Sequence, residues 1–161
     1  MVAGSFVSSI YGIPRATQDV DIVIAPTFDS LNALLALLAR DECYVDADVA
    51  RDEFRRHSQF NVIDEASGWK VDFIFRKSRP FSRTELARRV PMNILGVSMF
   101  AASAEDTILS KLEWAKLGES ERQLRDVRGI LDTQGNALDF AYIEQWLDEL
   151  EVRELWDRVR S

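Results

Sequence analysis

The segment Asp19-Val20-Asp21-Ile22-Val23-Ile24-Ala25 decides how this chain of 161 residues is expected to fold. Its branched aliphatic side chains predict a buried strand over residues 20–25, which Pro26 ends. Because side chains alternate along a strand, Asp19 and Asp21 lie on the same face. Two carboxylates so close repel each other, and they are best tolerated in water or around a cation.

A third carboxylate, Asp72, stands in the apolar run Lys70-Val71-Asp72-Phe73-Ile74-Phe75. A lone carboxylate is costly to bury in such a strand. If the two strands are neighbours, Asp19, Asp21 and Asp72 converge on one site, and oxygen ligands without His or Cys favour Mg²⁺ or Mn²⁺. The simpler alternatives are a solvated strand end for the aspartate pair and an arginine or Lys70 as the partner of Asp72. The order and strand context of the three carboxylates favour a metal site.

Gly4 and Ser5 follow Val2-Ala3, which reads as the end of a strand, and residues 5–11 read as a short helix. Free backbone N–H groups and a hydroxyl at such a junction form a phosphate cradle, which the helix dipole strengthens. Gly-Ser is also an ordinary turn pair, so these two residues indicate little when taken alone.

The rest of the chain predicts an α+β fold with a helical C-terminal part. Strands and extended segments are expected at residues 60–64, 69–75, 90–94 and 97–100, and a helix at residues 31–38. A capping box at Ser82-Arg83-Thr84-Glu85 predicts the start of a short helix, whereas residues 41–57 are polar and have no assignment. Further helices are expected after Ser103, Ser120, Asp139 and Val152. We expect a core over residues 1–101 and a helical part over residues 102–161, packed together as one structural unit.

Composition narrows the class of protein. Hydrophobic residues make up 47% and charged residues 29%, as in ordinary globular proteins. No apolar run is long enough to span a bilayer, and no signal peptide is visible, so we expect no membrane partner. A single cysteine, Cys43, fits the reducing cytoplasm, and a single histidine, His57, argues against a zinc site. The net charge of −7 argues against tight nonspecific binding to nucleic acid and suits a site that collects divalent cations.

Two residues of the helical part have both a structural and a functional interpretation, and a third, Trp114, has only a structural one. Lys111 lies at the edge of the apolar face of its helix, where its side chain either snorkels to solvent or reaches nucleotide phosphates. Asp126 is expected in a surface ion pair, with a role near the metal as the alternative. Trp114 lies in an apolar helical stripe, and we expect it in the core.

Residues 4–22 resemble the signature of minimal nucleotidyltransferases. They are most similar to the AbiEii toxin-like branch, in which Gly-Ser or Gly-Gly precedes an Arg-x-Thr-x-Asp-x-Asp run, here Arg15 to Asp21. Residues 60–64 and 69–73 resemble core strands of that branch, and its helical Lys and Arg-Asp positions correspond to Lys111 and Arg125-Asp126. The resemblance covers nearly the whole chain.

This resemblance implies a nucleotidyltransferase (polymerase beta-like) fold, a small mixed sheet flanked by helices. It implies that Asp19 and Asp21 bind Mg²⁺ (or Mn²⁺), and that Asp72 is the third catalytic carboxylate, as general base or second-metal ligand. The expected reaction is in-line attack of an acceptor hydroxyl on the α-phosphate of an NTP, with pyrophosphate leaving. The acceptor is a small molecule, RNA or a protein.

The resemblance also assigns the nucleotide-binding residues. Gly4 and Ser5 are expected to hold triphosphate oxygens, and Arg15 and Thr17 to brace the metal loop or the nucleotide. For Lys111, the functional interpretation places its ammonium on the nucleotide phosphates.

Two rival functions accompany this expectation. The first is a toxin of a toxin–antitoxin pair, which would use the same chemistry on tRNA or protein and bind an antitoxin. The second is a nucleotide-binding module without catalysis. In the family a helix and a full strand precede Gly-Ser, whereas here only Met1-Val2-Ala3 do, which favours the second rival. Such a short strand would leave a sheet edge that another chain covers, as in a homodimer.

Overall fold

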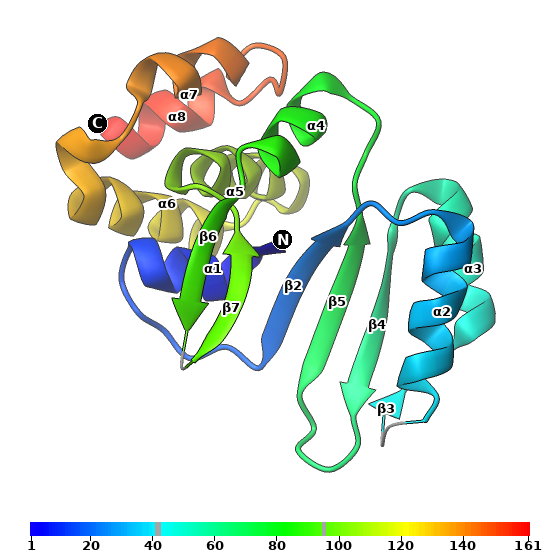
Figure 1. Cartoon of the computed structure of the whole chain (residues 1–161). Coiled ribbons are helices and arrows are strands. Elements are labelled where there is room, and N and C mark those ends of the chain that lie inside the picture. The colour runs from blue at the N-terminus through cyan, green and yellow to red at the C-terminus, as the bar shows by residue number, and fades with distance from the viewer. Residues whose placement is uncertain (41–42, 95) are drawn as a thin grey trace.

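A computed structural model describes residues 1–40, 43–94 and 96–161 of the chain (Figure 1). Its strands form one mixed sheet in the order β3-β4-β5-β2-β1-β7-β6. The two parallel pairs are β2 with β5 and β1 with β7, and the other neighbours are antiparallel. The strands are β1 Val2–Ala3, β2 Asp19–Ile24, β3 Cys43–Tyr44, β4 Gln59–Asp64, β5 Lys70–Phe75, β6 Val90–Ile94 and β7 Val97–Ala101.

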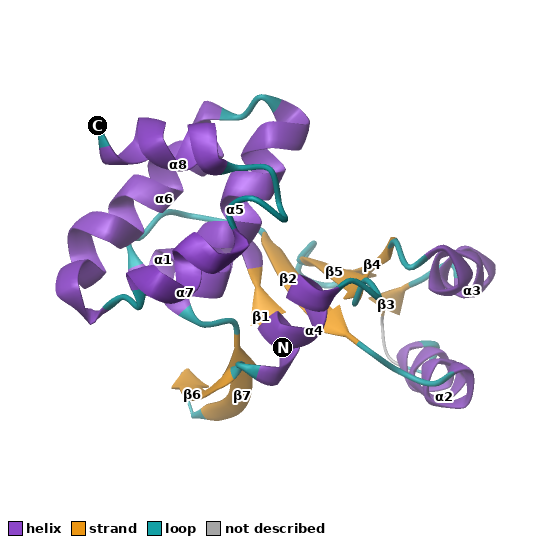
Figure 2. Cartoon of the chain, turned by 90° about the horizontal axis from the view of Figure 1, so that it is seen from above, coloured by secondary structure: helices purple, strands orange, loops and turns teal. Residues whose placement is uncertain are grey.

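Helices cover the two ends of this sheet (Figures 1 and 2). Helices α2 and α3 lie at the β3–β4 end, whereas α1, α5, α6, α7 and α8 gather at the other end. The mixed sheet flanked by helices confirms the predicted fold class. The helices are α1 Gly4–Tyr11, α2 Phe28–Leu38, α3 Ala47–Arg56, α4 Pro80–Ala87, α5 Ala104–Gly118, α6 Glu121–Gln134, α7 Phe140–Trp146 and α8 Arg153–Arg160.

The pairing of β2 with β5 brings the predicted carboxylates together. The two strands pair in parallel along six residues, with Asp21 opposite Asp72 and Asp19 opposite Lys70. The other face of this part of the sheet is apolar: Phe60 of β4 and Phe75 of β5 are buried in a core cluster with residues of α2 and α3. Burial of one face therefore fixes the register and leaves the carboxylates on the opposite face.

A larger core cluster joins α4 to the C-terminal helices, with Ile108, Leu112, Ile130 and Trp156 among its fully buried side chains. Helix α1 connects this cluster to the sheet, because Tyr11 packs both against it and against the cluster formed by Val2, Val7 and Ala101. None of the helices in the described parts of the chain is long and apolar enough to span a membrane.

The start of α4 differs from the sequence prediction. Helix α4 begins at Pro80 with Arg79 as its N-cap, so the predicted capping box at Ser82 to Glu85 is wrong. Proline at the first helical position supplies the start, since its missing N–H would have no helical partner there. Ser82 and Glu85 are instead buried inside the helix, with the Ser82 hydroxyl accepting from Arg79 Nε at 3.0 Å.

Strand β1 occupies an inner position of the sheet. Val2 and Ala3 pair with β2 on one side, and Val2 pairs with β7 on the other. Met1 extends the pairing, because its backbone exchanges hydrogen bonds with Val23 at 2.8 and 3.0 Å. The chain then turns directly from β1 into α1 at Gly4, beside the carboxylates of β2.

Candidate functional site

Asp19, Asp21 and Asp72 lie on one face of the central strands, as the sequence predicts. Asp72 is 8% exposed, and Lys70 Nζ lies 2.9 Å from its Oδ2. This ion pair raises the pKa of Lys70, and the charges of Asp19 and Asp21 add to the effect. Of the alternatives considered for Asp72, the structure therefore contains the lysine pair.

Asp21 lies between the other carboxylates and the turn at Gly4. Burial raises its pKa, and the neighbouring charge of Asp72 raises it further, whereas Lys111 and a hydrogen bond from the Ser5 backbone oppose the rise. Asp21 is thus a carboxylate with excess negative charge around it. A bound cation would relieve this repulsion.

Gly4 is required by the close approach of Asp21. A Cβ atom built on Gly4 would lie 1.7 Å from Asp21 Oδ2, and the φ angle of Gly4 is +64°. Glycine meets both requirements, because it has no Cβ atom and readily adopts a left-handed backbone conformation. The glycine of the predicted phosphate cradle is therefore also the residue that lets β1 and β2 meet at the carboxylates.

Ser5, Arg15, Asp126 and Lys111 form one hydrogen-bonded network behind this turn. The Arg15 guanidinium donates to the Ser5 hydroxyl, and its Nε and Nη2 atoms each lie 3.2 Å from an oxygen of Asp126. Lys111 Nζ lies 2.7 Å from Asp126 Oδ2 and 2.8 Å from Gln123 Oε1. Asp126 thus ties α6 to both α5 and the loop that precedes β2.

The positions of Lys111 and Asp126 correct two sequence interpretations. Lys111 is only 3% exposed, so it does not snorkel to solvent, and Asp126 is not part of a surface ion pair. Burial lowers the pKa of Lys111, and the pairing with Asp126 partly offsets this. A buried cation so paired is held in a fixed place near Asp21.

A cleft opens beside the carboxylates, between the central sheet and helices α4 and α5. Gly4, Ser5, Asp19, Asp21 and Lys111 all line it. Asp72 does not line this cleft but lies next to Asp21 on the adjacent strand.

Two other predicted residues act outside the cleft lining. Arg15 donates a hydrogen bond to the Ser5 hydroxyl, as part of the network with Asp126 and Lys111. The Thr17 hydroxyl exchanges hydrogen bonds of 3.2 and 3.3 Å with the Asp19 backbone, so it braces the loop at the start of β2.

Trp114 and Glu85 line the cleft, although the sequence patterns predict no role at the site for either. Trp114 lines the cleft and is 50% exposed, so the expectation that it packs in the core is wrong. Glu85 of α4 also lines the cleft while 7% exposed, and it accepts a hydrogen bond of 2.9 Å from the Ser110 hydroxyl. The helical periodicity of α5 indicates that Trp114 faces away from the buried side of the helix. No sequence feature near Glu85 indicates that it is buried.

Glu85 makes stability depend on pH. Burial raises its pKa from 4.5 to about 7, against the opposing hydrogen bond from Ser110. Between these values the folded chain holds a proton that the unfolded chain releases, so stability is lost as pH rises from 4.5 to 7. The full loss is about 3 kcal/mol, from 1.36 kcal/mol per pKa unit.

We expect Glu85→Gln to remove this loss of stability at higher pH, because glutamine does not ionise. The variant should therefore have a larger free energy of unfolding than the wild type at pH 8, measured by urea unfolding. Equal pH dependence in both proteins would contradict the assignment.

The ligand types at the site fit a hard divalent cation. Three carboxylates on one face supply oxygen ligands, and the nearby Gly4 leaves room for close approach of an anion. In the described part of the chain, however, no three acidic, histidine or cysteine side chains are already gathered as a metal-binding group. Asp21 lies against Gly4, and Asp72 pairs with Lys70. Metal binding would therefore require these side chains to turn toward each other.

Comparisons with known proteins show a likeness to a solved structure. No family model matches the chain, and no curated protein sequence matches it. Among solved structures, the chain is similar to an antigenic nucleotidyltransferase-like protein from Paracoccidioides brasiliensis, with a TM-score of 0.57 and 18% identity. The match covers 99% of this chain and 83% of that one. At this identity the likeness concerns the fold, so the chain has the fold of a nucleotidyltransferase-like protein.

Proposed function

We propose that the protein is a cytoplasmic, metal-dependent nucleotidyltransferase that moves a nucleoside monophosphate from an NTP to an acceptor. The observation that carries the proposal is the placement of Asp21 between Asp72 on one side and the Gly4-Ser5 turn on the other. Asp19, Asp21 and Asp72 would hold Mg²⁺ or Mn²⁺. The cation would neutralise the triphosphate and favour attack by the acceptor.

The other residues of the site have distinct roles in this proposal. Lys111, buried and fixed by Asp126, supplies a positive charge for the phosphates. The Ser5 backbone N–H, which lies close enough to Asp21 to lower its pKa, would become available to a phosphate oxygen when Asp21 turns away. Asp72, on the side away from Gly4, would accept the proton of an acceptor hydroxyl or be a second-metal ligand.

The proposal is tested by transfer of label from α-³²P-labelled NTPs in the presence of Mg²⁺. Each NTP is incubated with the protein and with total RNA, protein or small-molecule acceptors, while pyrophosphate release is followed. We expect labelled product and pyrophosphate with the wild-type chain, and neither with Asp19→Asn/Asp21→Asn. Pyrophosphate release at equal rates from both proteins would contradict the assignment of the site.

A finer proposal is that the chain is the toxin of a toxin–antitoxin pair. It is favoured by the run from Arg15 to Asp21, because Arg15 and Asp126 of the AbiEii-like pattern are joined in one network. In this case induced expression arrests growth, the Asp19→Asn/Asp21→Asn variant does not, and co-expression of an adjacent antitoxin gene restores growth. Normal growth on strong expression of the wild-type chain would rule out the toxin role but not nucleotidyl transfer.

One observation favours a nucleotide-binding module without catalysis. A group expected to hold phosphate is engaged within the protein, since the Ser5 hydroxyl accepts a hydrogen bond from Arg15. Such a module would bind NTP but release no pyrophosphate with any acceptor. The transfer assay described above therefore separates the two functions.

A further inference from the structure

Helix α5 presents a stripe of side chains to the cleft, and the character of this stripe changes along the helix. Thr107, Ser110 and Lys111 form its polar part, and Trp114 and Leu117 its apolar part. Spacings of three and four residues keep all five on one face. Trp114 and Leu117 are 50% and 65% exposed, so the cleft has an uncovered apolar surface next to its buried cation.

The contacts of Lys111 relate this apolar surface to the Gly4 side of the site. Across the sheet, Asp72 on β5 is followed by Asp21 on β2, and then by Gly4 after β1. Lys111 of α5 contacts the network of Ser5, Arg15 and Asp126, and therefore belongs to the side of Gly4. The side of Asp72 is left for the acceptor, because attack and departure are in line at the reacting phosphate.

We propose that Trp114 is the surface on which the base of the bound nucleotide stacks. This inference rests on the proposed function, with the triphosphate near Lys111 and the Gly4-Ser5 turn. Trp114 lies one turn beyond Lys111, about 5 Å farther along the helix axis, where the ribose and base follow the phosphates. An indole stacks on any base through its π-face, so this surface favours nucleotides over bare phosphates without selecting one base.

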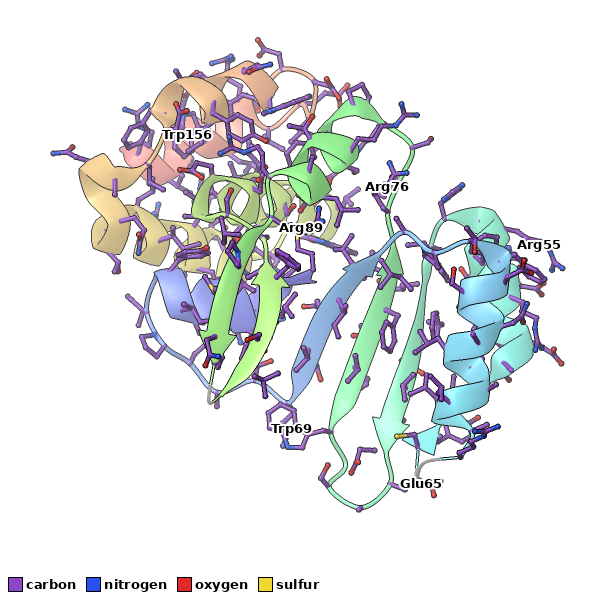
Figure 3. The ribbon with its side chains drawn as sticks, in the orientation of Figure 1. Arg55, Glu65, Trp69, Arg76, Arg89 and Trp156 are labelled. Atoms are coloured by element: carbon purple, nitrogen blue, oxygen red, sulfur yellow. The ribbon has the colours of Figure 1, made fainter. Side chains whose placement is uncertain are left out.

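The chain contains a matched control for this role. Trp69 is 45% exposed, similar to Trp114, but it lies outside the cleft. It directly precedes β5, whereas the cleft residue Arg76 directly follows that strand, so the two residues lie at opposite ends of β5 (Figure 3). Replacing either tryptophan by alanine therefore removes a half-exposed indole, and only Trp114→Ala changes the cleft. The other two tryptophans, Trp146 and Trp156, are buried in the helical core.

The experiment measures, by calorimetry with Mg²⁺, the binding of non-hydrolysable α,β-methylene NTP analogues and of inorganic tripolyphosphate. We expect Trp114→Ala to weaken the analogue that the wild type binds most tightly by about 5- to 150-fold, the range for loss of one base–aromatic stack. Tripolyphosphate, which has no base, should bind Trp114→Ala and wild type within twofold. Trp114→Phe should retain most of the analogue affinity, and Trp69→Ala all of it.

Two outcomes overturn the base-stacking role while leaving the proposed function in place. One is unchanged analogue binding by Trp114→Ala, which would mean that the indole contacts an acceptor or nothing. The other is an equal loss of analogue and tripolyphosphate, which would mean that the substitution disturbs Lys111. If the wild-type chain binds neither ligand, the proposed function fails, and the stacking role fails with it.

Discussion

Replacing Gly4 with alanine is expected to destabilise the protein by about 3 kcal/mol and to abolish nucleotide binding. The new methyl group would lie 1.7 Å from Asp21 Oδ2, so Asp21 or the β1–α1 turn must move. The φ angle of +64° adds left-handed strain, and strain and overpacking each cost about 1–3 kcal/mol. Urea unfolding and calorimetric titration with an NTP analogue and Mg²⁺ measure the two effects.

Gly68→Ala is the matched control for Gly4→Ala. Gly68 also has a left-handed backbone, with φ of +73°, but no atom lies within 4 Å of a Cβ built on it. It should therefore show only the backbone cost of about 1 kcal/mol and unchanged nucleotide binding. If Gly4→Ala loses no more stability than Gly68→Ala and still binds nucleotide, Asp21 does not depend on the missing side chain at Gly4.

Replacing Asp72 with asparagine is expected to reduce turnover by roughly 10²–10⁴-fold, the usual contribution of a positioned acid or base. NTP affinity should fall much less than turnover, because Asp19 and Asp21 remain in the cleft as metal ligands and Asp72 lies outside its lining, on the side away from Gly4. Asparagine keeps the shape of the side chain but cannot take a proton or supply a full charge. Steady-state pyrophosphate release gives kcat and KM separately, and the loss should lie in kcat.

The control for Asp72→Asn is Asp52→Asn, which removes a carboxylate from an exposed pair with Arg55 on α3. That pair lies at the far end of the sheet (Figure 3), so turnover should be unchanged. Equal activity of Asp72→Asn and wild type would remove Asp72 from the catalytic carboxylates. The only role left for Asp72 would then be to balance the charge of Lys70 in their ion pair.

The central strands and the carboxylates were predictable because local pattern and tertiary role agree there. The aliphatic run after Asp19 predicts β2, and the apolar run around Asp72 predicts β5, each within one residue of the observed bounds. Helices begin directly after Ser103 and Asp139, as expected, and both side chains cap their helices through hydrogen bonds. The convergence of Asp21 and Asp72 needed only one further condition, that the two strands pair in parallel.

The rest depended on contacts between distant residues. Asp126 meets Lys111 and Arg15 only after α6 folds back against α1 and α5, so its sequence neighbours indicate a surface helix. The expectation for Trp114 is wrong for a different reason. At 100° per residue it lies roughly 120° from the centre of the buried face of α5, which is outside the core-facing stripe of the helix. Strand β3 has two residues, too few for a periodic pattern.

The most direct test of the central claim is the binding of Mn²⁺, followed by electron paramagnetic resonance of the free ion in the presence of an NTP analogue. The wild-type chain is expected to bind at least one Mn²⁺ per molecule under these conditions. The Asp19→Asn/Asp21→Asn variant, once circular dichroism shows that it is folded, is expected to bind none at the same concentrations. Equal Mn²⁺ binding by the two proteins, or none by the wild type, would contradict a metal–nucleotide site at these carboxylates.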